Sequence, residues 1–184
     1  TVLGNGKAES SPKMGGMSFE EWQQAKEIPD TQADRKQFKE YQNLLGKKAP
    51  RYYTDFQDIK YNDPEQWEKL KEEAHMERVI RRAPCVLTKR KFRGYFLKPG
   101  AKHSDDFFGV GYTEDDIRLL RYHIAKQFDR SKATPRESKY GIENFDIVMK
   151  LGKNKTGTFI TGWTVDKEGD APRIVTGYRR EPKQ

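Results

Sequence analysis

The sequence predicts an α+β fold in which helices come first and a sheet follows. Apolar residues recur at helical spacing through the first half of the chain, whereas alternating strand patterns dominate its last part. Short connections between the last three strand candidates indicate an antiparallel meander. We therefore expect N-terminal helices followed by a strand, a helix and a three-stranded antiparallel meander, together forming one twisted sheet.

The first half carries four helical patterns. Ser18 and Glu21 have the spacing of a capping box, so a helix should begin there. Gly46 suits the C-terminal cap of a later helix, and Pro64 suits the first turn of another. The predicted helices cover about 18–28, 34–45, 54–59 and 64–82.

After Pro84 the pattern changes. A basic stretch leads into Phe92–Leu97, whose aromatic residues predict a strand. Thr113 is expected to begin a helix with an apolar stripe from Ile117 to Phe128. The three meander strands are predicted at about 145–151, 158–165 and 173–179.

This organisation suggests three segments. Residues 1–16 are rich in Gly, Ser and Lys and are interpreted as a flexible linker. Residues 17–84 form a helical adaptor, and residues 85–184 form the α+β domain. The beginning of the chain is interpreted as an internal position of a longer polypeptide.

Composition restricts the function classes. The 184 residues carry a net charge of +8, with 35% charged and 34% hydrophobic residues, which favours a polyanionic partner, either nucleic acid or an acidic protein. The sequence has neither a membrane-span pattern nor a signal-peptide pattern. Its single cysteine, Cys85, excludes an intramolecular disulfide framework and is interpreted as a buried thiol.

Cofactor and metal motifs are weak. Gly109-Val-Gly111 precedes a helix but lacks the third glycine and the parallel βαβ unit of a nucleotide-binding fingerprint. The run from Lys102 to Asp106 places polar residues next to one another on a loop, which is poor spacing for metal ligands. We therefore expect neither a cofactor nor a metal.

Phosphodiester cleavage of RNA without a metal needs a base, an acid and cations. Histidine titrates near neutral pH and suits proton transfer, whereas Lys, Arg, Tyr and Thr can stabilise the charged phosphate. We expect the His103 loop and the strand face of Thr176 and Tyr178 to form two walls of one cleft. The candidate catalytic residues are His103, Lys102, Thr161, Arg173, Thr176 and Tyr178.

Each candidate has a structural alternative. His103 could be a solvated loop residue, Thr161 could pack in the sheet, and Tyr178 is also an ordinary strand residue. His123 lies beside the apolar stripe of its predicted helix and remains open as a second acid or base. The candidate RNA-binding residues could instead protect an exposed sheet edge; they are Lys89, Arg90, Lys91, Arg93, Lys98 and Arg179.

Several motifs carry a resemblance to a known group. GYFLKPGAKH (94–103), GYTEDD (111–116), TGW (161–163) and PRIVTGY (172–178) resemble the C-terminal toxin domains of bacterial polymorphic toxins. The helical segment, with FKEYQNLLG (38–46) and YNDP (61–64), resembles the region that precedes such domains in phage minor-capsid (head-morphogenesis) proteins.

The resemblance implies a small nuclease of the barnase/EndoU/colicin/RelE type. It would act as an antibacterial, metal-independent ribonuclease, with tRNA as one candidate substrate, delivered by secretion or by phage into the bacterial cytoplasm. A cognate acidic immunity protein would be its partner. Some relatives are expected to carry a histidine where this chain has Tyr178, so Tyr178 or Lys102 would assist His103. The alternative is a non-enzymatic module of a phage structural protein that binds nucleic acid or capsid.

Overall fold

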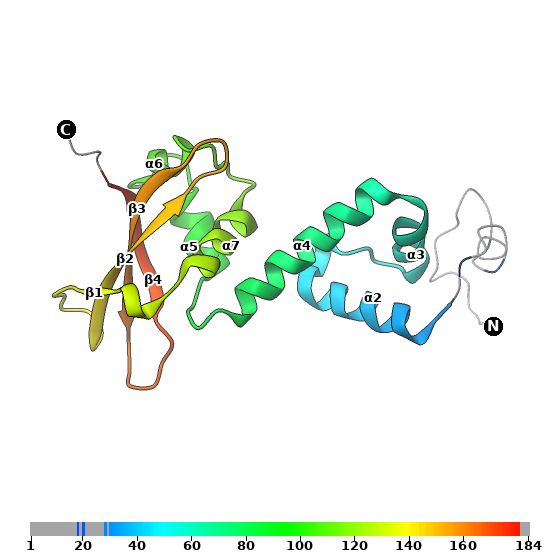
Figure 1. Ribbon diagram of the computed structural model, residues 1–184, viewed down its shortest axis with the longest axis horizontal. Helices are drawn as coiled ribbons and strands as arrows, with labels where there is room; N and C mark the ends of the chain where they lie inside the picture. The colour runs from blue at the N-terminus through cyan, green and yellow to red at the C-terminus, as the bar shows by residue number, and fades with distance from the viewer. Residues whose placement is uncertain (1–17, 19, 21–27, 29, 181–184) are drawn as a thin grey trace. The chain divides into compact units, whose positions relative to one another are not determined.

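The computed structural model describes Ser18, Glu20, Ile28 and residues 30–180 (Figure 1). The chain divides into two compact units, residues 1–77 and 78–184. Helices build the first unit, and the second combines helices with an antiparallel sheet, which confirms the predicted α+β class. The predicted linker, 1–16, and most of the helix predicted over 18–28 lie outside the described residues.

The first unit contains α2 (Gln32–Leu45), α3 (Tyr53–Asn62) and the first part of α4 (Pro64–Arg82). The Thr31 hydroxyl caps α2 by accepting a 3.0 Å hydrogen bond from the Asp34 N–H. Gly46 ends α2 with a φ of 56°, a backbone conformation that favours glycine. These helices match the predicted segments.

An aromatic cluster holds the helices of the first unit together. The Tyr41 ring stacks on the Trp67 ring at 5.7 Å, and both contact the fully buried Phe56. Beside this cluster, the buried Asp34 accepts hydrogen bonds from Lys60 Nζ at 2.6 Å and from the Tyr61 hydroxyl at 2.5 Å. Burial would raise the pKa of Asp34, but these hydrogen bonds outweigh it and lower the pKa. The carboxylate therefore joins α2 to α3.

The division between the units falls within α4. Leu70 and Ala74 belong to the core of the first unit, whereas Ile80 belongs to the core of the second. The boundary expected from the sequence, at 84, lies just past the end of this helix. Within the described part of the chain, no helix has the length and apolar composition needed to cross a membrane.

The second unit is built on a four-stranded sheet in the order β1-β2-β3-β4. Consecutive strands are antiparallel, so the predicted three-stranded meander is present. A bulge between Gly162 and Trp163 shifts the pairing of β3 with β4. The strands are β1 (Thr134–Pro135), β2 (Glu143–Leu151), β3 (Gly157–Val165) and β4 (Arg173–Arg179).

Helices cover one face of this sheet, with α5 and α7 on the same side of the strands (Figure 1). Alternate residues of β2 and β3, including Ile147, Phe159 and Trp163, face this core, and the Phe107 ring stacks on Phe159 at 4.8 Å. The other face carries the residues between them. The covering helices are α5 (Lys89–Lys91), the π-helix η3 (Phe92–Phe96), α6 (Ser104–Phe108) and α7 (Ile117–Gln127).

The strand predicted over Phe92–Leu97 is wrong, because this segment is helical. Thr88 caps α5 through its hydroxyl, which accepts from the Lys91 N–H at 3.3 Å, and η3 follows directly. Phe92 and Phe96 then lie on one side of the helical turn, fully buried with their rings 5.0 Å apart. The predicted helix from Thr113 also begins later, at Ile117, and neither α6 nor β1 was predicted.

A buried hydrogen-bond relay crosses the centre of the sheet. Trp163 Nε1 donates to Thr161 Oγ1 at 2.8 Å, and the same hydroxyl donates to the Ile147 carbonyl at 2.8 Å. Thr161 is fully buried. The relay satisfies a tryptophan donor that would otherwise be buried without an acceptor.

Replacing Thr161 by Val tests this relay. The variant leaves the Trp163 N–H without its acceptor, so the free energy of unfolding should fall by about 1–3 kcal/mol. Thr158→Val is the matched control, because the Thr158 hydroxyl only accepts from the exposed Lys150 ammonium. Urea unfolding measures both variants. Equal stabilities of the two would contradict the structural role of Thr161.

Candidate active site

Two successive turns position His103. In the first, the Ala101 N–H donates to the Lys98 carbonyl at 3.0 Å, and Gly100 has a φ of 83°. In the second, the Ser104 N–H donates to the Ala101 carbonyl at 3.2 Å. His103 occupies the third position of this turn, with φ 67° and ψ 1°, where glycine is usual. Its backbone is therefore strained.

No other non-glycine residue among those described has a positive φ. The left-handed conformation costs an L-residue roughly 1–2 kcal/mol, although histidine is enriched there relative to most residues. Strain of this kind occurs preferentially at functional sites. The conformation aims the imidazole back over α6 and toward β4.

The His103 ring lies against Tyr178, with the ring centroids 5.3 Å apart. The His103 loop therefore meets the predicted strand face of Thr176 and Tyr178 at Tyr178. His103 Nδ1 is 3.8 Å from Asp106 Oδ2, on the first turn of α6. The same oxygen accepts a 3.0 Å hydrogen bond from the Arg179 N–H on β4. His103, Asp106 and Tyr178 thus form one cluster at the end of β4, and Asp106 is the member that sequence reasoning missed.

The remaining catalytic candidates separate into two groups. Lys102 is exposed and adjoins His103, and Thr176 lies two residues before Tyr178 on the same face of β4. Thr161 does not join them, because its side chain points into the core and is used by the relay. Arg173 lies at the opposite end of β4, where its Nε donates to Asp166 Oδ2 at 2.6 Å.

The predicted RNA-binding residues are likewise divided. Lys98 belongs to the first turn before His103, and Arg179 follows Tyr178. The others lie on α5 and η3, where Lys91 Nζ sits 4.4 Å from the centre of the Tyr95 ring. Burial, and then the charge of Arg173, lowers the pKa of Lys91. Lys91 therefore shares the electrostatic surroundings of Arg173, at the start of β4.

Comparison with known proteins identifies one family. A domain of unknown function (DUF6883) matches residues 78–181, which cover the whole sheet and the His103 cluster. The chain belongs to this family. No curated protein and no solved structure matches it. The match begins where the second compact unit begins, so the DUF6883 domain and that unit coincide.

His123 lies elsewhere in the DUF6883 domain. Its Nδ1 is 2.6 Å from the hydroxyl of the buried Tyr112, and that hydroxyl accepts a 2.9 Å hydrogen bond from the Gly152 N–H. Burial raises the pKa of Tyr112 to about 12, so the phenol keeps its proton and donates it to His123. The pair ties α7 to the loop that follows β2.

The described residues contain no group of three His, Cys, Asp or Glu side chains able to hold an ion. Cys85 is buried, as the sequence indicated, and burial raises its pKa to about 12. This thiol is therefore protonated at neutral pH and unreactive.

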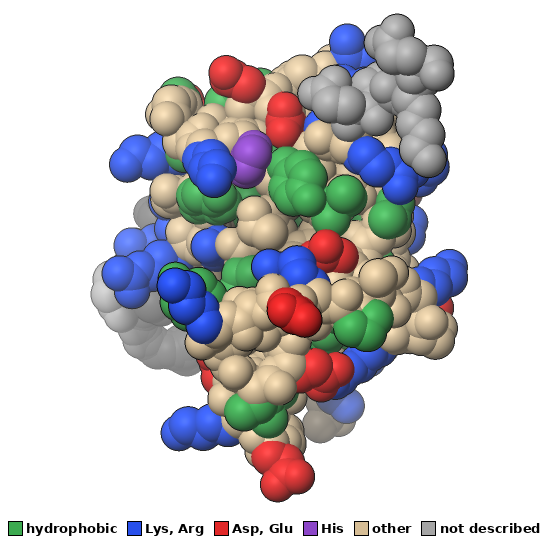
Figure 2. All heavy atoms as spheres, turned by 90° about the vertical axis from the view of Figure 1, so that its left-hand side faces the viewer, with side chains coloured by type: hydrophobic (Ala, Val, Ile, Leu, Met, Phe, Trp, Pro, Cys, Tyr) green, Lys and Arg blue, Asp and Glu red, His purple; other side chains and the backbone are tan. Residues whose placement is uncertain are grey.

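Figure 2 shows the sheet face that the helices leave open: basic side chains lie around its margin and also near its centre, among hydrophobic side chains, a histidine and carboxylates. One row of paired residues crosses this face. Asp146 on β2 pairs with Gly162 on β3, which pairs with Thr176 on β4. Arg136, before β2, reaches this row, and its Nε lies 2.9 Å from Asp146 Oδ1. Sequence reasoning did not single out Arg136 or Asp146.

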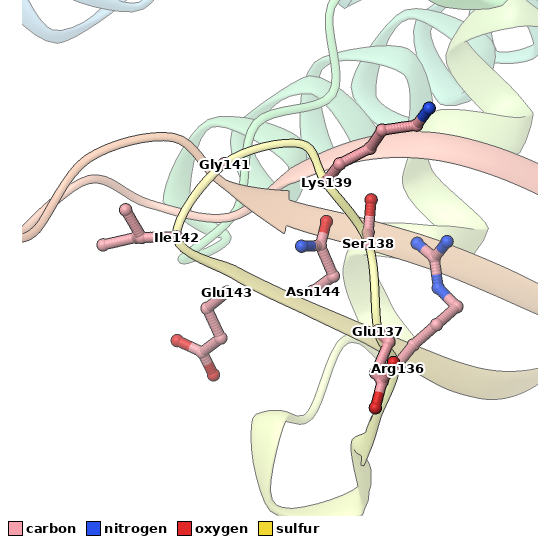
Figure 3. A pocket seen from close by; sticks show the side chains of 8 residues that line it. All are labelled: Arg136, Glu137, Ser138, Lys139, Gly141, Ile142, Glu143 and Asn144. Carbon is pink, nitrogen blue, oxygen red and sulfur yellow. The ribbon is translucent and has the colours of Figure 1, made fainter.

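Arg136 also borders an open pocket of about 580 Å³ in the connection between β1 and β2 (Figure 3). The side chains of Ser138 and Asn144 lie within this loop, whereas those of Ile142 and Glu143 point away from it. None of the predicted catalytic residues lines the pocket. The pocket therefore lies apart from His103 and Tyr178, the predicted catalytic residues that meet in the structure.

The Tyr112–His123 pair predicts a pH dependence of stability. Burial, and then the charge of Lys126, lowers the pKa of His123 below its usual 6.5, which outweighs the opposing charge of Asp116. As the pH falls, His123 therefore takes up its proton at a higher pH in the unfolded chain than in the folded protein. The contribution of His123 to stability is complete above about pH 6.5 and is lost as the pH falls through the lowered pKa.

Urea unfolding of wild type and His123→Gln at about pH 7.5 and about pH 5.5 checks this expectation. Glutamine keeps an acceptor for the Tyr112 hydroxyl but does not titrate. The loss of stability at the lower pH should shrink in the variant, while every other titratable group is common to both proteins. An identical pH dependence in the two would refute the assignment.

Proposed function

We propose that the DUF6883 domain of this chain is a ribonuclease that cleaves RNA by attack of a ribose 2′-hydroxyl on the adjacent phosphate, without a metal. The observation that carries the proposal is the meeting of the strained His103 with Tyr178 and Asp106. A base, a hydroxyl donor and a carboxylate are thereby gathered at one strand end, next to the exposed cation Lys102.

Each group has a role in this reaction. His103 takes the 2′-hydroxyl proton as the 2′-oxygen bonds to phosphorus. The bond from phosphorus to the 5′-oxygen breaks, and the leaving oxygen takes a proton from Tyr178. The products are a 2′,3′-cyclic phosphate and a free 5′-hydroxyl. Lys102 stabilises the negative charge that develops on the phosphate oxygens.

Asp106 acts on His103 by position and charge. Its carboxylate faces Nδ1, which leaves Nε2 as the nitrogen available to the substrate. The 3.8 Å separation from Nδ1 is longer than a hydrogen bond, and such contacts often tighten when substrate binds. A carboxylate at this position stabilises the imidazolium that forms when the base accepts its proton.

The basic residues suit a polyanionic substrate. Lys98 and Lys102 lie in the turns around His103, and the group on α5 and η3 offers a second phosphate contact. The +8 net charge of the chain favours association with RNA, with tRNA one candidate. We further propose that the domain is an antibacterial toxin delivered by a longer polypeptide into the bacterial cytoplasm, where an acidic immunity protein would cover the basic surface.

Replacing His103 by Asn is the first test. Asparagine tolerates the left-handed backbone, so the fold should remain, but it cannot accept the proton. Cleavage of total RNA in EDTA should fall by at least about 100-fold. Circular dichroism verifies folding, and His75→Ala, on α4 outside the family match, is the histidine control.

Two results would contradict the ribonuclease proposal. Cleavage that persists in His103→Asn would remove His103 from the chemistry. Salt-sensitive RNA binding by the wild type without any product would instead favour the non-enzymatic nucleic-acid-binding alternative.

Replacing Asp106 by Asn tests its positioning role. The amide oxygen can still accept from the Arg179 N–H, so stability should change little, but the charge beside His103 is lost. We expect kcat to fall roughly tenfold to 100-fold with KM unchanged. Steady-state cleavage of a fluorescent oligoribonucleotide measures both constants. An unchanged kcat would show that Asp106 serves only to hold the strand.

A further inference from the structure

We propose that Arg136, Asp146 and Thr176 form a subsite that binds one nucleobase beside the scissile bond and so determines where the RNA is cut. The inference rests on the proposed ribonuclease function and adds a recognition site to it. The three residues come from the segment before β2, from β2 and from β4, and they converge over Gly162 of β3.

Gly162 makes this convergence possible. A Cβ at this position would lie 2.6 Å from Thr176 Cγ2 and 3.0 Å from Arg136 Nη2. Any larger residue would therefore displace the guanidinium from the strand. Its φ is not positive, so the glycine is required here for space and not for backbone conformation. The guanidinium therefore lies close over the β3 backbone at Gly162.

The Arg136 guanidinium has unused hydrogen-bonding capacity. Nη2 is buried and has no hydrogen-bond partner, and Nε is close to Asp146 Oδ1 without the alignment of a hydrogen bond. The two side chains are 35% and 29% exposed, so a base would meet their exposed atoms, whereas Nε and Nη2 lie beneath these. Such a pair presents donors and acceptors side by side to whatever lies on the sheet.

This pattern suits a nucleobase better than a phosphate. Base edges carry an acceptor next to a donor, which matches an arginine beside a carboxylate. The Asp146 charge offsets that of Arg136 and would repel a phosphate placed on the pair. The Thr176 hydroxyl can donate or accept as the base requires.

The position relative to the His103 cluster fits an adjacent nucleotide. Tyr178 lies two residues beyond Thr176 on the same strand face, which is about 7 Å along β4. Tyr178 pairs with Ile160 of β3, which pairs with Val148 of β2, and Val148 is 48% exposed. An RNA strand with its reacting phosphate at His103 would therefore lay a neighbouring base over Gly162.

Binding of oligonucleotides that cannot be cleaved tests the subsite separately from the reaction. Methylation of the 2′-oxygen removes the attacking hydroxyl, so the full chain can be titrated with 2′-O-methyl homo-trinucleotides of the four bases. Fluorescence anisotropy should show a spread of roughly tenfold or more between the best and the worst base. In Arg136→Lys this spread should fall below about threefold, because lysine keeps the charge but not the planar fork.

Arg130→Lys is the matched control. Arg130 also pairs with a carboxylate, that of Glu143, but lies outside the row over Gly162. It should keep the wild-type spread. If Arg136→Lys does not fold by circular dichroism, Asp146→Asn replaces it, with the same loss of spread expected.

The outcomes separate the two proposals. Base-selective binding that is lost in Arg136→Lys supports the subsite even if the wild type never cleaves RNA, in which case only the ribonuclease proposal fails. Cleavage by the wild type with equal binding of all four bases overturns the subsite alone. A spread that survives in Arg136→Lys, or that disappears equally in Arg130→Lys, also overturns it.

Discussion

The Asp106 carboxylate is the contact on which the candidate site depends. It accepts a hydrogen bond from the Arg179 N–H on the outer edge of β4 and faces His103 Nδ1. Residues 106 and 179 are far apart in sequence, so this one group joins α6 to the end of the sheet. An edge-strand N–H without a partner would also invite pairing with another chain. The carboxylate satisfies that N–H and also lies beside the imidazole.

The position of His103 follows from how the rest of the chain packs. Phe107, one turn along α6 from His103, stacks on Phe159 of β3, which fixes the helix against the inner sheet face. Ser104 is buried and its hydroxyl donates to the Ala101 carbonyl at 2.9 Å, so the turn cannot relax by rotating outward. His103 must then accept a positive φ. Contacts on both sides of His103 offset the cost of its strained backbone, as in a preorganised site.

Local sequence signals predicted the elements that local rules determine. Pro64 and Gly46 mark helix ends through backbone chemistry, and the strand Arg173–Arg179 was predicted with its observed limits. The strand prediction for the segment with Phe92 and Phe96 was wrong for a geometric reason. Two residues separated by four positions lie on the same side of a strand, but they also lie about one turn apart on a helix. The Thr88 cap, and burial against the sheet, selected the helix. His103 and Tyr178 could be paired in advance, but Asp106 could not, because its partner is a backbone N–H that only tertiary structure brings near.

The two faces of β3 explain how one strand can serve both the core and the proposed recognition site. Odd-numbered residues from Phe159 to Trp163 enter the core, where Thr161 is buried and its hydroxyl is used by the relay. The intervening Gly162 faces outward and leaves room for Arg136 and Thr176. A one-residue shift of register would exchange these environments, burying the recognition row and exposing the core. The bulge lies directly after Gly162, so Ile174 keeps its place in the core while Thr176 and Tyr178 stay together on the open face. The register that closes the hydrophobic core is therefore the same register that assembles the proposed site.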